Sequence, residues 1–266
     1  MVKKLIKYDF KAFAKIMFPA YLVLLGVGAL YRFITIFETD GLFYTIFNGS
    51  AISILVISMI VCSVMTYIVS VVRFYKGLYT AEGYLSFTLP VTPAAHIFSK
   101  LVTTLIFDVL TAAASFLAIV IATAGETFVE IMKAEFYLIG KIFSKVGGQS
   151  AIYIIELVIL VFVVAATSHL LTFMCISIGQ LVNKHKVLLA VGIFFGFYLV
   201  RQILGTMFIA IGAVTSFFAD IAKFAADNPY TFFHLLFCGI IVLGLILGGV
   251  YFFVTKRIMT KRLNLE

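Results

Sequence analysis

Long runs of hydrophobic residues, separated by short polar segments, dominate the sequence. The runs cover about residues 18–37, 50–72, 101–124, 151–182, 187–218 and 231–255. A helix needs about 20 mostly apolar residues to cross the hydrocarbon core of a bilayer. A transmembrane β-barrel would instead show short segments of alternating hydrophobicity. The pattern therefore predicts an all-α integral membrane protein with about six transmembrane helices.

The fifth hydrophobic run, residues 187–218, is too long for one straight span. It is interrupted by Arg201, Gln202 and Gly205. A helix that ends near Leu204, followed by a re-entrant hairpin that dips back into the outer leaflet, fits this interruption better than one rod. We therefore expect a broken fifth span. The connection before it, residues 183–186, is short, so the fourth and fifth spans should be antiparallel neighbours.

Two segments outside the runs are amphipathic. Residues 1–17 alternate five lysines with apolar residues, which is typical of a helix that lies in a headgroup layer. The same segment could be a basic flank that orients the first span, and both interpretations place it in the cytosol. Residues 125–150 have apolar residues near helical spacing and end at Gly147 and Gly148. We expect a helix on the outer membrane surface here.

The composition agrees with a membrane location. Of the 266 residues, 63% are hydrophobic and 12% are charged, and the mean hydropathy is +1.16. Soluble domains are about 45–50% apolar and about 25% charged. The excess of apolar residues cannot be hidden in one globular core. The sequence shows no internal repeat and no domain linker, so we expect a single transmembrane domain over residues 1–266.

The distribution of basic residues predicts the orientation. Residues 1–17, 73–100, 183–186 and the tail 256–266 carry fourteen of the twenty lysines and arginines. Because basic residues gather on the cytoplasmic side of membrane proteins, these segments and both termini should be cytosolic. The net charge of +8 is therefore no sign of nucleic-acid binding. We expect no cleaved signal peptide at the N-terminus.

Motifs of nucleotide-dependent or metal-dependent catalysis are absent from the sequence. There is no G-x-x-x-x-G-K-[ST] P-loop, no H-E-x-x-H zinc motif and no G-x-S-x-G nucleophile elbow. The cysteines, Cys62, Cys175 and Cys238, lie within apolar runs and share no metal-ligand spacing. We therefore expect no catalytic residue, metal site or cofactor in this chain.

Ionisable residues within or near the predicted spans are few. They are Asp108, Glu156, His169, Arg201 and His234. A charge at the bilayer centre costs at least about 2.5–3.5 kcal/mol on insertion scales, so such residues usually face a partner or water. The sequence is compatible with a polar lining of a substrate path and with structural pairs inside the membrane.

Two G-x-x-x-G patterns occur in the last two runs. They are Gly192 with Gly196, and Gly244 with Gly248. Small residues at this spacing let two helices approach closely. Both contact with a second subunit and packing within the same chain are compatible with these patterns.

Residues 73–100 form the longest polar-to-amphipathic interruption in the first half of the chain. Landmarks follow one another there in this order: Arg73, Glu82 and Gly83, an amphipathic run over residues 85–89, Pro90-Val91-Thr92, and Lys100. In this order they resemble the cytoplasmic loop of ABC-2-type permeases, the membrane subunits of bacterial ATP-binding-cassette exporters. The chain departs from the E-[RK]-G-T run common in that family. Glu82 directly precedes Gly83, Tyr84 stands in place of the threonine, and no further acidic residue follows soon after.

The resemblance implies a transmembrane subunit of an ATP-driven exporter in the bacterial plasma membrane. It would pair with a second permease subunit, identical or related, and with a P-loop ATPase subunit that binds ATP and Mg²⁺. A coupling helix in the loop would dock on that ATPase and carry its motion to the adjoining spans. The residues expected at this contact are Tyr79, Glu82, Gly83, Tyr84, Leu85, Phe87 and Leu89.

The family moves its substrates outward across the lipid bilayer. The 29 phenylalanines and the small number of mid-membrane charges favour an amphipathic or hydrophobic exported substrate, such as a peptide. The alternative function is that of an ion-coupled secondary carrier, or of a membrane scaffold or sensor without a transport cycle. For residues 73–100 the alternative is a loop that lies on the inner leaflet.

Overall fold

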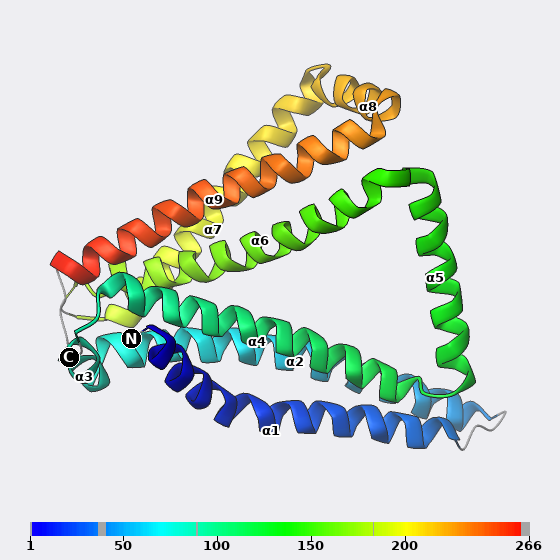
Figure 1. Cartoon of the computed structure of the whole chain (residues 1–266), viewed down its shortest axis with the longest axis horizontal. Coiled ribbons are helices and arrows are strands. Elements are labelled where there is room, and N and C mark those ends of the chain that lie inside the picture. Colours follow the sequence, from blue (N-terminus) through cyan, green and yellow to red (C-terminus); the bar gives the residue numbers. More distant parts are fainter. Residues whose placement is uncertain (1, 37–40, 89, 183, 262–266) are drawn as a thin grey trace. The chain divides into compact units, whose positions relative to one another are not determined.

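Almost all of the chain is helical in the part that the computed structural model describes, residues 2–36, 41–88, 90–182 and 184–261, and no strand occurs there. Six helices are long and apolar enough to cross a membrane. They are α1 (Val2–Ile36), α2 (Leu42–Tyr79), α4 (Pro93–Ala122), α6 (Ser150–Gly179), α7 (Lys186–Val214) and α9 (Pro229–Lys261), labelled in Figure 1. The prediction of an all-α chain with six candidate spans is confirmed.

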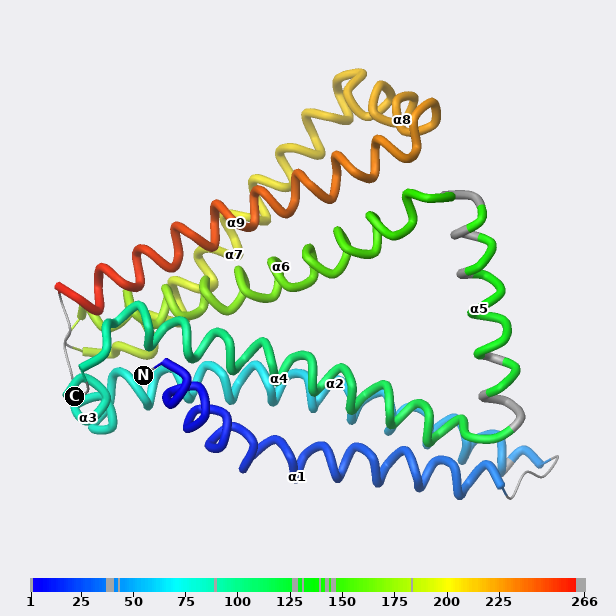
Figure 2. The backbone as a smooth tube through the Cα atoms, viewed as in Figure 1, coloured from blue at the N-terminus to red at the C-terminus, as the bar shows by residue number. Residues whose placement is uncertain are grey.

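The first helix contains both the amphipathic segment and the first predicted span. α1 runs without a break from Val2 to Ile36, so Pro19 lies inside the helix and not in its first turn. A proline lacks a backbone N–H and its ring crowds the carbonyl four residues earlier, which bends a helix. The tube of α1 changes direction within its N-terminal half (Figure 2). Residues 2–17 and the span are therefore parts of one bent helix.

The fifth predicted span differs from the expectation. α7 continues through Arg201, Gln202 and Gly205 as far as Val214, so the predicted end near Leu204 is wrong. Single polar residues leave the backbone hydrogen bonds of a helix intact, which explains why they do not interrupt it. The chain turns after Val214 and then forms α8 (Phe217–Asp227). The re-entrant placement of this hairpin in the outer leaflet stays a prediction.

The segment predicted as an outer helix is also helical. α5 (Glu126–Val146) is followed by a single 3₁₀ turn, Gly147–Gln149. Gly147 has a φ of +63°, a left-handed conformation that glycine adopts without steric cost and that commonly ends helices. The predicted helix and its glycine terminator are confirmed, while its position on the membrane surface stays a prediction.

The helices belong to two compact units. Unit 1 comprises Met1–Phe74 and Phe98–Lys145, and unit 2 comprises Tyr75–Ile97 and Val146–Glu266. The single membrane domain expected from the sequence stays a prediction.

The core of unit 1 lies between α1, α2 and α4. The rings of Phe13 and Phe107 stack with their centroids 4.3 Å apart, and Met17 and Leu24 are buried beside them. Further along α1, a Cβ added to Gly28 would lie 2.7 Å from the carbonyl oxygen of Ala118. The absence of a side chain at Gly28 therefore allows α1 and α4 to approach closely.

Hydroxyl groups join the same three helices. The Tyr21 hydroxyl lies 2.8 Å from the Thr111 hydroxyl, which is 2.7 Å from the hydroxyl of Thr66. Ser70 and Thr104 form a second such pair, 2.9 Å apart. All of these residues are buried. Because an unsatisfied hydroxyl is costly in an apolar interior, each bond favours one register of the helices.

In unit 2, α6 packs closely along α9. A Cβ added to Gly244 would lie 2.6 Å from Cγ1 of Val163, and one added to Gly248 would lie 3.3 Å from the Thr167 hydroxyl. The Thr167 hydroxyl also donates to the carbonyl of Gly244 at 3.0 Å. Gly244 and Gly248 therefore pack within the chain, which was one of the two alternatives for this pattern.

The connection between α6 and α7 is tight. A Cβ added to Gly179, the last residue of α6, would lie 2.7 Å from Cβ of Ala190 on α7. The predicted antiparallel neighbours are thereby confirmed.

Candidate partner-docking site

A short helix lies between the second and third candidate spans. α2 ends at Tyr79, α3 covers Ala81–Thr88, and α4 begins at Pro93. α3 ends before Pro90, which lacks the backbone N–H needed to continue a helix. Pro93 occupies the first position of α4, where that N–H would have no partner in any case. The short helix expected between these spans is confirmed.

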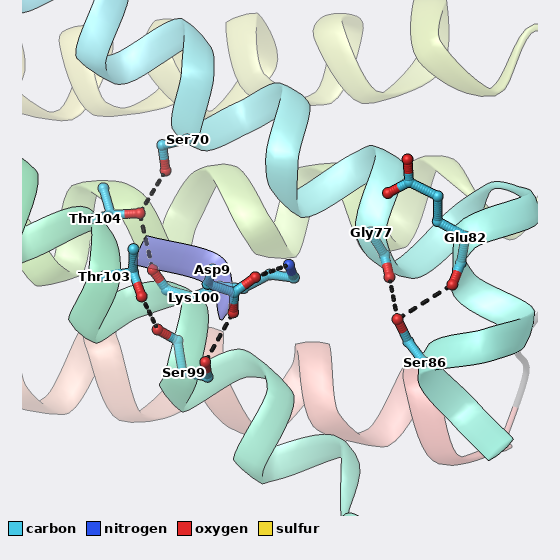
Figure 3. Close-up of polar contacts among 9 residues, drawn as sticks. All are labelled: Asp9, Ser70, Gly77, Glu82, Ser86, Ser99, Lys100, Thr103 and Thr104. Carbon is cyan, nitrogen blue, oxygen red and sulfur yellow. Dashed lines mark hydrogen bonds and ion pairs between the residues drawn. The ribbon is translucent and has the colours of Figure 1, made fainter. Parts of the chain in front are cut away.

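Hydroxyl groups fasten α3 to the end of α2. The last carbonyl groups of any helix lack partners within it. The Ser86 hydroxyl donates to the carbonyl of Gly77 at 2.9 Å, and it lies 3.2 Å from the carbonyl of Glu82 (Figure 3). The Thr80 hydroxyl donates to the carbonyl of Lys76 at 2.7 Å. Two carbonyl groups in the last turn of α2 are thus satisfied by the residues that follow.

Tyr79 anchors this region to α6. Its side chain is fully buried, and its hydroxyl donates to the Ser177 hydroxyl at 2.7 Å. Ser177 in turn donates to the carbonyl of Phe173 at 2.8 Å. A buried side chain cannot contact a soluble partner, so Tyr79 holds this region in place against α6 and does not form part of its exposed surface.

The outer surface of α3 is apolar and exposed. The side chain of Leu85 is 73% exposed and that of Tyr84 is 57% exposed. Glu82, three residues before Leu85, is exposed in the first turn of the helix, where a negative charge is favourable. We call Glu82, Tyr84 and Leu85 the α3 surface.

The other predicted docking residues are placed differently. Gly83 is buried. Phe87 is half-buried and its ring centroid lies 5.8 Å from that of His96 on α4. Leu89 lies outside the described residues. The expected contact set therefore narrows to the α3 surface, with Phe87 at its margin.

One pair of intramembrane ionisable residues is brought together. Nδ1 of His234 on α9 lies 2.8 Å from Oε2 of Glu156 on α6. Tyr153 stacks on the His234 ring at a centroid distance of 4.1 Å, and Sγ of Cys238 lies 3.7 Å from Oε1 of Glu156. Glu156 therefore forms a structural pair between two helices, which was one of the alternatives for these residues.

The sequence did not single out His234 as the partner of Glu156. A signal was present, because Tyr153 and Glu156 are three residues apart and His234 and Cys238 are four apart. Each spacing places two polar side chains on one helix face. The pairing of these two faces depends on the register of α6 against α9, which the sequence alone does not specify.

The remaining polar residues of the spans are divided between the two units. Asp108 is half-buried in the part of α4 that belongs to unit 1. In unit 2, His169 is buried on α6, whereas Arg201 is exposed on α7. A role of these residues in a substrate path stays a prediction.

The glycines of α7 have open surroundings. A Cβ added to Gly192 or Gly196 would meet no atom within 4 Å in the part of the chain that the structure describes. This face of α7 is therefore open to a neighbour or to lipid. No group of three or more metal-ligating side chains that could hold an ion occurs among the described residues.

Comparison of the chain with protein-family models, with curated proteins and with solved structures finds no match. The family resemblance therefore rests on the residues of the loop, and the family stays a prediction.

Proposed function

We propose that this chain is the transmembrane permease subunit of an ATP-binding-cassette exporter, which moves an amphipathic or hydrophobic substrate, such as a peptide, out of a bacterial cell. A separate P-loop ATPase subunit supplies the energy. The observation that carries the proposal is an anchored short helix, between two apolar helices, with exposed apolar side chains at Tyr84 and Leu85.

The exposed apolar surface supports a docking role. Exposed apolar patches on a soluble face mark contacts with other proteins or with membranes. An amphipathic helix commonly binds by laying its apolar face into a groove of its partner. In the orientation predicted from the charges, α3 faces the cytosol, where a soluble ATPase would be found.

The anchoring of α3 supports a coupling role. A docking helix can move its neighbouring spans only if it is rigidly attached to them. The bonds of Ser86 to Gly77 and of Tyr79 to Ser177 provide such attachments within unit 2. A loop that merely rested on the inner leaflet would not require a buried tyrosine as an anchor.

A second permease subunit is part of the proposal. An arginine that faces lipid within a span is costly, and Arg201 is exposed on α7. A protein neighbour or an aqueous path next to α7 would remove this cost. The open glycines at positions 192 and 196 would allow a helix of a neighbouring subunit to approach.

The test is co-purification with the ATPase encoded beside this chain, combined with a substitution on the α3 surface. Leu85→Asp should abolish co-purification and the ATP hydrolysis that depends on the complex, because truncating or charging a central interface anchor costs at least about 2 kcal/mol. The combination with Phe87→Asp should do the same. Membrane insertion should persist, since α3 is not a span.

The matched control is Leu42→Asp at the beginning of α2. Leu42 is 80% exposed, so this variant introduces the same charge at a similarly exposed leucine outside α3. It should leave ATPase binding unchanged. Equal binding by wild type and Leu85→Asp, or the absence of an ATPase gene beside this one, would reject the proposal. Transport that requires no ATPase and is abolished by Asp108→Asn would indicate an ion-coupled carrier instead.

A further inference from the structure

A small polar pocket lies within unit 1, between α1, α2 and α4. Its cavity volume is about 10 Å³, and the pocket is open to the exterior. Its polar lining consists of Asp9, Ser70, Arg73, Lys100, Thr103 and Thr104. Two cations and one carboxylate meet in this pocket, so its formal charge is positive.

The carboxylate is already bound to one of the cations. Oδ1 of Asp9 lies 3.1 Å from Nζ of Lys100. The Ser99 hydroxyl donates to Oδ2 of Asp9 at 2.8 Å (Figure 3). Asp9 thus neutralises Lys100, and the excess positive charge of the pocket belongs to Arg73.

The guanidinium of Arg73 has an unsatisfied donor. Its Nε atom is buried, and no acceptor within hydrogen-bond distance is found in the described part of the chain. Leaving a buried donor unpaired is costly, more so for a charged group. Nε–H and the neighbouring Nη–H form a planar fork that matches two oxygens of a phosphate or carboxylate. The pocket therefore offers a directional site for an oxyanion.

The hydroxyl groups that line the pocket already form hydrogen bonds within the chain. Thr103 donates to the carbonyl of Ser99, and Thr104 donates to the carbonyl of Lys100, each at 2.9 Å. Thr104 also lies 2.9 Å from the Ser70 hydroxyl (Figure 3). The Ser70–Thr104 bond joins α2 to α4, and the other two bonds lie within α4. The bond between the two helices keeps Arg73 on α2 beside Lys100 on α4.

The surroundings favour the phosphate of a lipid. Lys3, Lys4, Lys7 and Lys11 are all exposed along the same helix that contributes Asp9. In the predicted orientation, these lysines and the pocket lie at the cytoplasmic surface of the membrane. Basic pockets between transmembrane helices on this side bind the head groups of anionic lipids.

We propose that Arg73 and Lys100 bind the phosphate group of an anionic phospholipid of the inner leaflet, with Asp9 as the internal anion that competes for Lys100. The same chemistry would accept free phosphate, so the experiment separates the two sources. The site uses residues of unit 1 alone and does not depend on the exporter function or on α3.

The experiment measures lipid retention by the full-length protein. The protein is reconstituted with equal amounts of phosphatidylglycerol and phosphatidylcholine, extracted into mild detergent, and analysed by native mass spectrometry. Wild type should retain phosphatidylglycerol preferentially. Arg73→Gln should lower the ratio of retained phosphatidylglycerol to phosphatidylcholine about tenfold, as expected for the loss of a charged hydrogen bond. Arg73→Lys should give an intermediate ratio, since it keeps the charge and loses the fork.

Two control variants make the same changes of charge outside the pocket. Arg257→Gln matches Arg73→Gln, and Glu82→Gln matches Asp9→Asn. Arg257→Gln changes an exposed arginine near the end of α9 and should leave the ratio unchanged. Asp9→Asn should raise the ratio about threefold, because it frees Lys100 from a partly exposed ion pair. Glu82→Gln, which makes the same change of charge on the α3 surface, should not.

The source of the phosphate is tested in phosphatidylcholine alone. If millimolar inorganic phosphate raises the melting temperature of wild type but not of Arg73→Gln, and phosphatidylglycerol adds no further increase, the site takes soluble phosphate.

Equal lipid ratios for Arg73→Gln, Arg73→Lys and Arg257→Gln would overturn the proposal. A decreased ratio for Asp9→Asn would overturn the role of Asp9.

Discussion

The glycine pair of α9 and the glycine pair of α7 follow the same sequence pattern but have different surroundings. Gly244 and Gly248 lie against Val163 and Thr167 of α6, at distances that leave no room for a Cβ at position 244. Gly192 and Gly196 have no neighbour within 4 Å among the described residues. The pattern permits close approach, and the presence of a partner helix decides whether it is used.

The two helices differ in their polar residues as well. The polar groups of the α6–α9 contact are matched, because Thr167 bonds to Gly244 and Glu156 bonds to His234. On α7, Arg201 is exposed on the surface of the chain. An internal contact therefore satisfies its own polar groups, whereas the surface of α7 is consistent with a contact that another molecule completes.

The largest effect should come from filling the α6–α9 contact. Gly244→Val adds a branched side chain where a Cβ alone would be 2.6 Å from Val163. We expect a loss of about 1–3 kcal/mol in the free energy of unfolding, the usual cost of overpacking. The measurement is an unfolding titration in detergent. A stability equal to that of wild type would mean that α6 and α9 do not pack at this glycine.

A smaller loss of stability should come from the hydrogen-bonded pair of Glu156 and His234 in the same contact. A double-mutant cycle with Glu156→Ala and His234→Ala should give a coupling energy of about 1 kcal/mol, since polar contacts between membrane helices are worth about 0.6–2 kcal/mol. Unfolding titrations of the four proteins provide this value. Additive effects of the two substitutions would show that the residues do not stabilise the contact together.

The smallest effect on stability should come from the open glycines. Gly192→Val makes the same chemical change as Gly244→Val, but at a position with free space. The free energy of unfolding should stay within about 0.5 kcal/mol of wild type, as for most surface substitutions. Cross-linking between subunits should decrease if this face of α7 contacts a second permease subunit. Unchanged cross-linking together with unchanged stability would assign the face to lipid.

Much of the fold follows from hydrophobic patterning. Six continuous apolar runs predicted six long helices, because backbone hydrogen bonds in a bilayer are best satisfied within a helix. Pro90 follows the end of α3, Pro93 begins α4, and Gly147 directly follows the last residue of α5. These signals are local, so they can be read from neighbouring residues alone.

One local signal was misleading. Arg201 and Gly205 do not interrupt α7, although we expected a broken span there. Pro19 likewise lies inside α1 without ending it. A helix of this length retains enough hydrogen bonds and packing to accommodate single exceptions, so tertiary context overrides local preference.

The candidate site was only partly predictable. The existence of a short helix between the second and third spans came from the sequence, but its bounds, Ala81–Thr88, did not. Nor did the sequence separate the buried anchor from the exposed surface of this region. Tyr79 and Tyr84 are the same residue type, five positions apart, and one is buried against Ser177 while the other is exposed. Which of them faces outward depends on where α6 lies.

The sequence by itself thus determined the class of protein, the number of long apolar helices and the existence of a short helix between two of them. These properties depend on composition and on periodicity along the chain. The tertiary structure decided which glycines pack against another helix and that Glu156 pairs with His234. It also decided that Arg73 retains an unsatisfied donor beside the ion pair of Asp9 and Lys100. Each of these depends on the register between helices far apart in sequence, which hydrophobic patterning leaves open because most apolar side chains are interchangeable in packing.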